Sequence, residues 1–298
     1  MRVHALTLHP GKWWVWIGLY CYYSSCTNHK SGVGVVYSLS SNDASIASSS
    51  RRNFLTASGL STLTLPLIAG AREPKQNPKN LVSVYFGAGC FWHLQHEFIL
   101  AETKLLNRQP KTFTARTGYA GGLQSGTNNR VCYHNGGRGY QSRDDYGKMG
   151  FAEVVELTIP RDTVPAFFER YLGLFNDKKK QRVDYMDKGA EYRSLIGLPG
   201  GGVDIDSPEM EAIRQCSQTN GYTLKNGVGN DGDTLRKAQI WVMDSSQFPF
   251  YQAEVYHQFH DDFLKDEPYG SDYNDLARME YNDGRLVQTS CPRDILPF

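Results

Sequence analysis

Cys90 is the side chain whose setting most strongly suggests chemistry. It lies in the stretch VYFGAGCFWHLQHEF at 84–98, between an alternating apolar segment and a pattern typical of a helix. The free N–H groups and positive dipole end of a helix stabilise a thiolate, which lowers a thiol pKa from about 8.5. Gly87 and Gly89 permit the tight turn that such a junction needs. Although a lone cysteine is more often a buried apolar residue, this position predicts a nucleophile.

The segments around Cys90 predict one α+β domain, with a mixed or antiparallel sheet and helices packed on it. Residues 81–88 alternate as in a half-buried strand, and Ser207-Pro208 is typical of a helix start. Residues 123–150 are rich in Gly, Asn, Arg and Tyr and are expected to form a long loop. The expected strands are 81–88, 112–119, 151–159, 192–198 and 235–243, and the expected helices are 91–106, 165–175, 208–217 and 251–264.

Charge and cysteine content exclude several classes of function. The chain of 298 residues has a formal net charge of +1, but residues 72–298 hold 27 basic and 30 acidic residues. A net charge of −3 argues against nucleic acid or anionic lipid as the main partner. No CxxC pair or zinc-finger spacing occurs among the six cysteines, so we expect neither a metal site nor a disulfide scaffold.

Residues 1–71 resemble a series of targeting signals. The apolar run 13–23 suits the core of a signal peptide, and the serine-rich 24–50 contains a single acid, as transit peptides do. SRRNFL at 50–55, followed by the mildly apolar 59–71, resembles a twin-arginine export signal. This order predicts delivery to a plastid, in particular the thylakoid lumen, with the stroma or another organelle as alternatives. A serine-rich leader with a chance arginine pair is the plainer interpretation.

Five ordered motifs give the remaining chain a family resemblance. The motifs are GCFW at 89–92, GYAGG at 118–122, GFAEVVEL at 150–157, DKGAEYRS at 187–194 and QAEVYHQ at 252–258. With these motifs the chain resembles the peptide methionine sulfoxide reductase A family over residues 81–265. The resemblance implies an enzyme that reduces the S epimer of methionine sulfoxide, free or in proteins, on a ferredoxin-like two-layer sandwich. It also implies no prosthetic cofactor, an external thioredoxin-like dithiol as reductant, and a monomer.

The resemblance assigns roles to the polar residues of these motifs. Cys90 attacks the sulfoxide sulfur, and Glu153, Tyr119 and Tyr192 surround the oxygen that must be protonated. A carboxyl beside apolar walls has a raised pKa and can act as a general acid. Asp187 matches an acid that orders the site. Considered alone, Glu153 would be a solvent-facing strand residue, the tyrosines packing residues and Asp187 a turn residue.

Phe91 and Trp92 are expected to bind the methyl group of the substrate. Contacts between sulfur and aromatic rings contribute about 0.3–1.5 kcal/mol, and the rings also exclude water. The alternative, core packing at the start of a helix, applies readily to at least one of the two.

Recycling requires a second thiol that converts the Cys90 sulfenic acid into a disulfide. Cys291 is the first choice, because we expect residues 266–298 to form an irregular tail with an exposed thiol. Cys132, in the long loop, is the second choice. Cys216 is expected to be a buried structural residue within a helix.

Two other interpretations remain open. A peptide-binding or redox-sensing protein without catalysis could use the same fold within 72–265. A metal site could use Cys90, His93 and His96, which share one side of a helix, but a full ligand set is missing. The chain also departs from the family motifs at four positions, namely His93, Gln95, Phe151 and Glu191.

Overall fold

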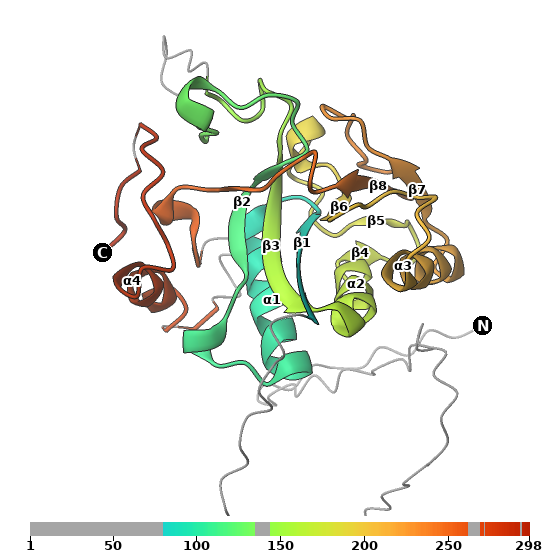
Figure 1. Cartoon of the computed structure of the whole chain (residues 1–298), viewed down its shortest axis with the longest axis horizontal. Helices are drawn as coiled ribbons and strands as arrows, with labels where there is room; N and C mark the ends of the chain where they lie inside the picture. Colours follow the sequence, from blue (N-terminus) through green and yellow to red (C-terminus); the bar gives the residue numbers. More distant parts are fainter. Residues whose placement is uncertain (1–79, 135–143, 262–268, 271, 293) are drawn as a thin grey trace, which may run out of the picture.

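A computed structural model of the chain describes residues 80–134, 144–261, 269–270, 272–292 and 294–298 (Figure 1). The targeting leader expected at 1–71 lies outside the described residues, so it stays a prediction. No helix in the described ranges is long and apolar enough to span a bilayer.

The centre of the fold is a seven-stranded mixed sheet in the order β7-β8-β6-β1-β3-β2-β9. Antiparallel pairs join β1 to β3 and β6, and β2 to β3 and β9, whereas β6, β8 and β7 run parallel. Two short strands, β4 (Phe175–Asn176) and β5 (Gln181–Arg182), form a separate hairpin. The seven strands are β1 (Leu81–Gly87), β2 (Arg116–Ala120), β3 (Ala152–Pro160), β6 (Leu195–Leu198), β7 (Thr223–Asn226), β8 (Gln239–Asp244) and β9 (Tyr251–Gln252).

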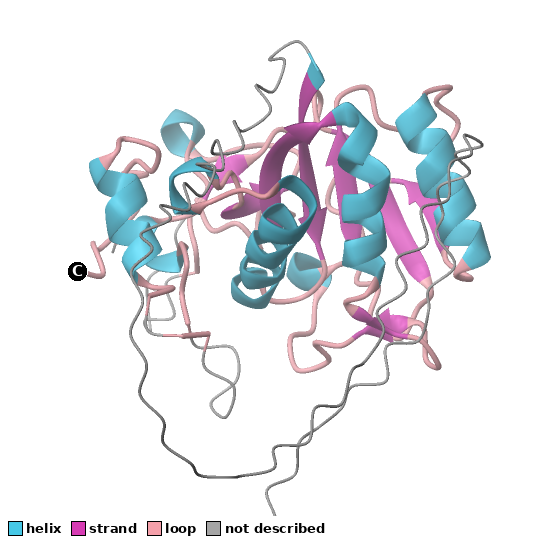
Figure 2. Ribbon diagram, turned by 90° about the horizontal axis from the view of Figure 1, so that it is seen from below, coloured by secondary structure: helices cyan, strands magenta, loops and turns pink. Residues whose placement is uncertain are grey.

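Three helices lie side by side on one face of the sheet (Figure 2). These are α1 (Phe91–Leu106), α2 (Val164–Leu172) and α3 (Pro208–Thr219). The Ser207 side chain accepts a hydrogen bond from the Met210 N–H, which caps α3 as the sequence predicts. The α+β class, the mixed sheet and the packed helices predicted from the sequence are therefore confirmed.

Both faces of the central strands are buried. Along β1, Val82, Val84 and Phe86 point into the main core below the helices. Tyr85 points to the other face, where its hydroxyl donates to the Phe248 carbonyl at 2.8 Å. Since neighbouring strand residues face opposite sides, β1 fixes the direction of the chain just before Cys90.

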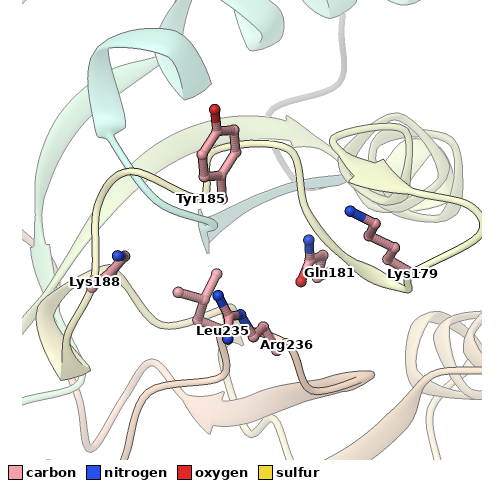
Figure 3. Close-up of a pocket in the computed structure, with 6 residues that line it drawn as sticks. All are labelled: Lys179, Gln181, Tyr185, Lys188, Leu235 and Arg236. Carbon is pink, nitrogen blue, oxygen red and sulfur yellow. The ribbon is translucent and has the colours of Figure 1, made fainter.

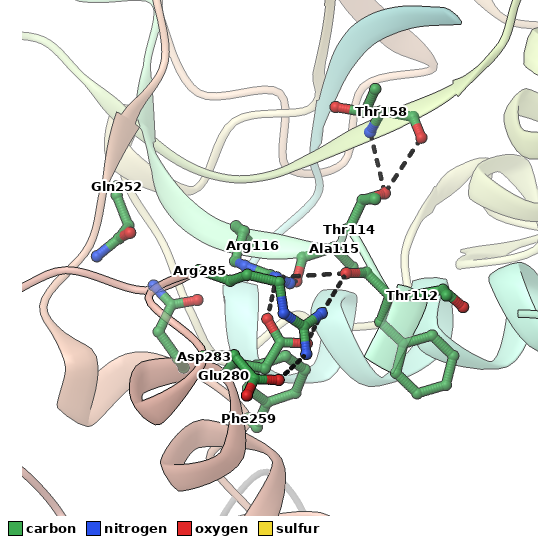
Figure 4. Close-up of polar contacts among 12 residues, drawn as sticks. Thr112, Thr114, Ala115, Arg116, Thr158, Gln252, Phe259, Glu280, Asp283 and Arg285 are labelled. Carbon is green, nitrogen blue, oxygen red and sulfur yellow. Dashed lines mark hydrogen bonds and ion pairs between the residues drawn. The ribbon is translucent and has the colours of Figure 1, made fainter. Parts of the chain in front are cut away.

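The C-terminal segment is less irregular than predicted, because it contains the helix α4 (Asp275–Asn282). Glu280, fully buried on α4, forms ion pairs with Arg116 of β2 and with Arg285 (Figure 4). Burial raises the pKa of Glu280 to about 7, and the two arginines oppose that rise. A buried charge persists only when it is paired, so these contacts fasten the tail to the sheet.

The helix predicted at 251–264 is wrong. Its described part forms β9, the single 3-10 turn η6 (Val255–His257) and a further turn at Gln258 and Phe259. The amide side chain of Gln258 accepts from the Thr117 N–H at 3.0 Å and donates to the Thr117 carbonyl at 2.9 Å. These long-range bonds hold the segment along β2 in place of a helix.

Candidate active site

Cys90 is the N-cap residue of α1, at the junction that the sequence predicts. β1 ends at Gly87, and Gly89 makes the turn with φ of +88°. A Cβ on Gly89 would lie 2.2 Å from a carboxylate oxygen of Asp184, so only glycine fits here. The Gly89 N–H also donates to the Tyr192 carbonyl at 3.1 Å. The thiol is thus fixed by two segments that lie about a hundred residues further along the chain.

Asp184 is a site residue that the sequence analysis missed. Its Oδ2 accepts from the Cys90 N–H at 2.8 Å, and its Oδ1 accepts from the N–H groups of Met186 and Asp187 at 3.1 and 3.3 Å. This buried carboxylate caps the first turn of α1 from outside the helix. Its only signal in the sequence is its position three residues before Asp187.

The pKa of Cys90 is raised, not lowered as the sequence predicted. Burial of the thiol is the largest cause, and the carboxyl groups of Glu153, Asp187 and Asp184 add to it. A backbone N–H at Trp92 stabilises the thiolate but does not compensate. The helix terminus therefore contributes as expected, while the surrounding acids and burial outweigh it.

Glu153 is a buried carboxylic acid on β3. Its Oε2 accepts from the Phe91 N–H at 3.0 Å, and its Oε1 accepts from the Tyr146 hydroxyl at 3.0 Å. Burial raises the pKa of Glu153 to about 8, against the lowering by these two hydrogen bonds. At neutral pH the group is therefore mostly protonated beside Cys90, as a general acid must be.

The hydroxyl that binds Glu153 comes from Tyr146, not from Tyr119. Tyr119 lies opposite Glu153 in the register of β2 and β3, but its hydroxyl donates to Glu254 Oε2 at 2.8 Å. Its ring stacks on that of Tyr146 at 4.7 Å between centroids. The structure thus corrects the direct role expected for Tyr119 and makes it a support for Tyr146.

Two further tyrosines complete the surroundings of Glu153. Tyr192, at the end of the 3-10 turn η5 (Ala190–Tyr192), interacts with Tyr146 and Tyr133. The Tyr133 ring stacks on Tyr146 at 5.7 Å, and its own N–H donates to Glu254. Burial and the nearby Glu153 raise the pKa of both Tyr133 and Tyr192, so these hydroxyls stay protonated. Tyr192 is placed as expected, whereas Tyr133 was missed.

Asp187 also lies close to Cys90, as the resemblance implies. Burial, then the charge of Asp184, raises the pKa of Asp187 to about 6. The Arg182 guanidinium opposes this rise, and it donates to the Asp187 carbonyl at 2.6 Å. The protonation state of Asp187 therefore changes close to neutral pH.

Trp92 lines a cavity of about 320 Å³, whereas Phe91 does not. The Trp92 indole N–H donates to His257 Nδ1 at 3.2 Å, and burial lowers the pKa of His257 to about 3. The neutral imidazole can therefore accept this bond. Phe91 is 1% exposed and packs against Tyr119, which fits the core alternative for one aromatic. The other lining residues are Tyr133, His134, Glu254, Tyr256, Pro292 and Ile295.

The two candidate resolving cysteines are bonded to one another. Cys132 and Cys291 form a disulfide with their Cα atoms 5.7 Å apart, while Cys90 and Cys216 are free. Cys291 is 6% exposed and Cys132 is fully buried, so the exposed thiol expected at Cys291 is wrong. The residues that follow these two cysteines, Tyr133 and Pro292, line the Trp92 cavity. Cys216 is buried within α3, as expected.

The alternative metal site at Cys90, His93 and His96 finds no support in the described residues. The one group of side chains there that is close enough to share an ion is Cys132, Glu254 and Cys291. Because its two sulfurs are bonded together, that group offers no thiolate ligands in this state.

Comparison with known proteins gives a consistent set of relatives. No family model matches the chain. A Geobacter sulfurreducens protein named peptide methionine sulfoxide reductase MsrA is 31% identical over 183 residues, covering 60% of this chain and 89% of the relative. The protein of that name from Pseudomonas aeruginosa (strain UCBPP-PA14) is 30% identical over 186 residues, covering 61% of this chain and 69% of the relative. A solved methionine sulfoxide reductase A of Corynebacterium diphtheriae aligns over 61% of this chain and 74% of its own, with 18% identity and a TM-score of 0.36.

Proposed function

The chain belongs to the peptide methionine sulfoxide reductase A family, and from that membership and the site we infer its reaction. It is an oxidoreductase that reduces the S epimer of methionine sulfoxide to methionine at the expense of thiols. The observation that carries this conclusion is the pairing of a free Cys90 with a buried, protonated Glu153. The nucleophile and the proton donor of a sulfoxide reductase are thereby present in one site.

The reductive step transfers the sulfoxide oxygen to the Cys90 sulfur. The Cys90 thiol and the sulfoxide react to give a Cys90 sulfenic acid and methionine, so Cys90 is oxidised by two electrons as the substrate is reduced. Glu153 donates a proton to the sulfoxide oxygen as the sulfur–oxygen bond weakens and regains one from the attacking thiol. The hydroxyls of Tyr146 and Tyr192 hold that oxygen, and Trp92 provides the apolar wall for the methyl group.

Recycling uses the Cys132–Cys291 pair. The Cys291 thiol displaces water from the sulfenic acid to form a Cys90–Cys291 disulfide. Cys132 then attacks the Cys291 sulfur, which releases the Cys90 thiol and leaves a Cys132–Cys291 disulfide. Cys132 is fixed by two backbone hydrogen bonds, since its N–H donates to the Asp144 carbonyl and its carbonyl accepts from the Tyr146 N–H, so Cys291 is the thiol that travels. The state after both exchanges matches the bonding in this structure. A thioredoxin-like dithiol then reduces the pair.

Substitution of the nucleophile tests the proposal. Cys90→Ser should abolish sulfoxide reduction, because a hydroxyl is a far poorer nucleophile towards sulfur at neutral pH. Cys216→Ser is the matched control, since Cys216 is the other free cysteine and lies in α3 outside the site. The assay is methionine release from methionine S-sulfoxide with dithiothreitol. Turnover by Cys90→Ser would refute the mechanism, and an inactive wild type would favour the non-catalytic redox protein.

The address of the enzyme is a separate proposal. The signals in 1–71 support a plastid enzyme of the thylakoid lumen. A fluorescent reporter fused after residues 1–75 should enter that compartment. Arg51→Lys combined with Arg52→Lys should retain it in the stroma, because the twin-arginine route requires both guanidinium groups. A cytosolic wild-type reporter would contradict the proposal.

A further inference from the structure

A second hollow lies beside the loop 183–188, whose Asp184 accepts a hydrogen bond from the Cys90 N–H. This hollow is lined by cationic side chains. Its volume is about 550 Å³, and Lys179, Lys188 and Arg236 converge on it from three separate segments (Figure 3). Gln181, Tyr185 and Leu235 complete the described lining, which contains no carboxylate. Residues 72–298 carry a net negative charge, so a cationic hollow here is a local exception.

These cations are available to a partner. Lys179, Lys188 and Arg236 are exposed, and none of their side chains forms an ion pair within the described part of the chain. Asp233, three residues before Arg236, is already used: it accepts from Arg182 at 3.1 Å and from the Gly189 N–H at 3.0 Å. Those bonds join the loops that carry Lys188 and Arg236, so the hollow is built before anything binds.

The loop 183–188 connects this hollow to the active site. Asp184 faces inward and accepts from the Cys90 N–H, whereas the next residue, Tyr185, lines the hollow. Asp187 faces the site in the same way, and the next residue, Lys188, lines the hollow. The site at Cys90 and the hollow therefore lie on opposite sides of this one loop, and a polypeptide bound at Cys90 would reach the hollow by passing over the loop.

The exposed side chains of this loop indicate what kind of molecule binds. Val183, Tyr185 and Met186 are 52%, 62% and 74% exposed, so apolar surface adjoins the cations. A small inorganic anion would make no use of that surface, whereas a polypeptide with acidic and apolar side chains matches both parts.

We propose that this hollow binds acidic side chains that flank the oxidised methionine in a polypeptide substrate. The inference rests on the proposed function and adds a substrate class: proteins whose oxidised methionine lies in an acidic segment. The cations attract the substrate, and the loop 183–188 then places the sulfoxide at Cys90. Because surface charges are screened by salt, the preference is strongest at low ionic strength.

The test compares three peptides that differ only in the residues around one central methionine sulfoxide. Those residues are glutamate, glutamine or lysine. At 0.1 M salt the wild type should reduce the glutamate peptide with a kcat/KM about five- to tenfold above the glutamine peptide, and the lysine peptide should be poorest. At 1 M salt, where the Debye length falls to about 3 Å, the three values should converge.

The variant Lys179→Glu/Lys188→Glu/Arg236→Glu should lose the preference for the glutamate peptide. The glutamate-to-glutamine ratio is taken within each protein, so a general loss of activity cancels, and thermal unfolding confirms that the variant folds.

The matched control is Lys104→Glu/Lys111→Glu/Lys225→Glu, which makes the same change of charge at exposed sites. Lys104 lies about 20 Å along α1 from Cys90. The control variant should keep the wild-type ratio of kcat/KM between the glutamate and glutamine peptides.

Two results would overturn the inference: equal kcat/KM for all peptides in the wild type, or an equal loss of preference in the control variant. Reduction of the glutamine peptide by the wild type shows that the proposed function stands even if the inference fails. If no peptide is reduced, fluorescence anisotropy of a labelled glutamate peptide still measures its binding to the protein. Equal binding by the wild type and by Lys179→Glu/Lys188→Glu/Arg236→Glu would refute the inference.

Discussion

Replacing Glu153 with glutamine should remove proton donation and leave the site otherwise folded. An amide has no proton that it can give to the sulfoxide oxygen, but its oxygen can still accept from the Phe91 N–H, as the carboxyl does at 3.0 Å. The amide NH2 then faces Tyr146, whose hydroxyl oxygen can accept from it in place of donating to the carboxyl. Loss of general acid catalysis typically slows a reaction by about 10²–10⁴-fold, and we expect that loss in the reductive step at pH 7.

The pKa of Glu153 sets how this loss depends on pH. With a pKa of about 8, the acid is about 90% protonated at pH 7, about half protonated at pH 8 and about 10% protonated at pH 9. The wild-type rate constant should therefore lose about tenfold between pH 7 and 9 relative to the glutamine variant. Burial raises the pKa of Cys90 in both proteins, but the charge of Glu153 adds to that rise in the wild type alone, so the thiol pKa is measured in each protein beside the rates.

The assay is a rapid-quench single turnover that measures methionine release from pH 6 to 9. Glu156→Gln is the matched control, because Glu156 lies on the same strand but three residues away, which turns it to the opposite face. That control should stay within about twofold of the wild type. A wild-type to Glu153→Gln ratio that is near one, or that does not change with pH, would refute the assignment of Glu153 as the acid.

Three further substitutions test the recycling route and the turn before the nucleophile. Cys132→Ser should accumulate a Cys90–Cys291 disulfide after one turnover, whereas Cys291→Ser should leave a sulfenic acid on Cys90. Mass mapping of the oxidised protein checks both results. A Cys90–Cys132 disulfide in Cys291→Ser would reverse the roles of the two cysteines. Gly89→Ala should lower the free energy of unfolding by about 1–3 kcal/mol, because its Cβ meets a carboxylate oxygen at 2.2 Å and φ is +88°. Urea unfolding measures this, and Gly232→Ala, where a Cβ has no neighbour within 4 Å, should change it by less than about 0.5 kcal/mol.

Sequence periodicity predicts the elements whose structure is decided locally. The helix at 91–106 matches α1 (Phe91–Leu106) because its apolar spacing, its starting turn and its end at Asn107 all agree. Ser207-Pro208 likewise predicts the start of α3, since a cap and a proline at the first position act within one turn. The setting of Cys90 follows from the junction of β1 and α1.

Interactions between distant segments decide the features that the sequence does not predict. The pKa of Cys90 depends on carboxyl groups 63 and 94 positions away, at Glu153 and Asp184, which no local pattern reveals. The hydroxyl on Glu153 comes from Tyr146, in a loop without periodicity, although Tyr119 occupies the motif. Only the pairing of β2 with β3 and the path of that loop settle which tyrosine reaches the acid.

The C-terminal tail also has contacts with distant segments that its own sequence patterns do not predict. Residues 266–298 have the composition of an irregular segment, yet Glu280 docks on Arg116 of the sheet and Cys291 is bonded to Cys132. Both partners lie more than 150 residues earlier in the chain, so sequence patterns within the tail predict neither contact. The buried disulfide implies that a protein reductant must displace part of the tail before it can reach the sulfurs.

Reduction of the two epimers of methionine sulfoxide by the purified chain with dithiothreitol tests the central claim most directly. We predict that the S epimer is converted to methionine with repeated turnover and that the R epimer is left unchanged, because Cys90, Glu153 and the wall at Trp92 bind the sulfur, its oxygen and its methyl group in one arrangement. Equal reduction of both epimers, or reduction of neither, would contradict the account.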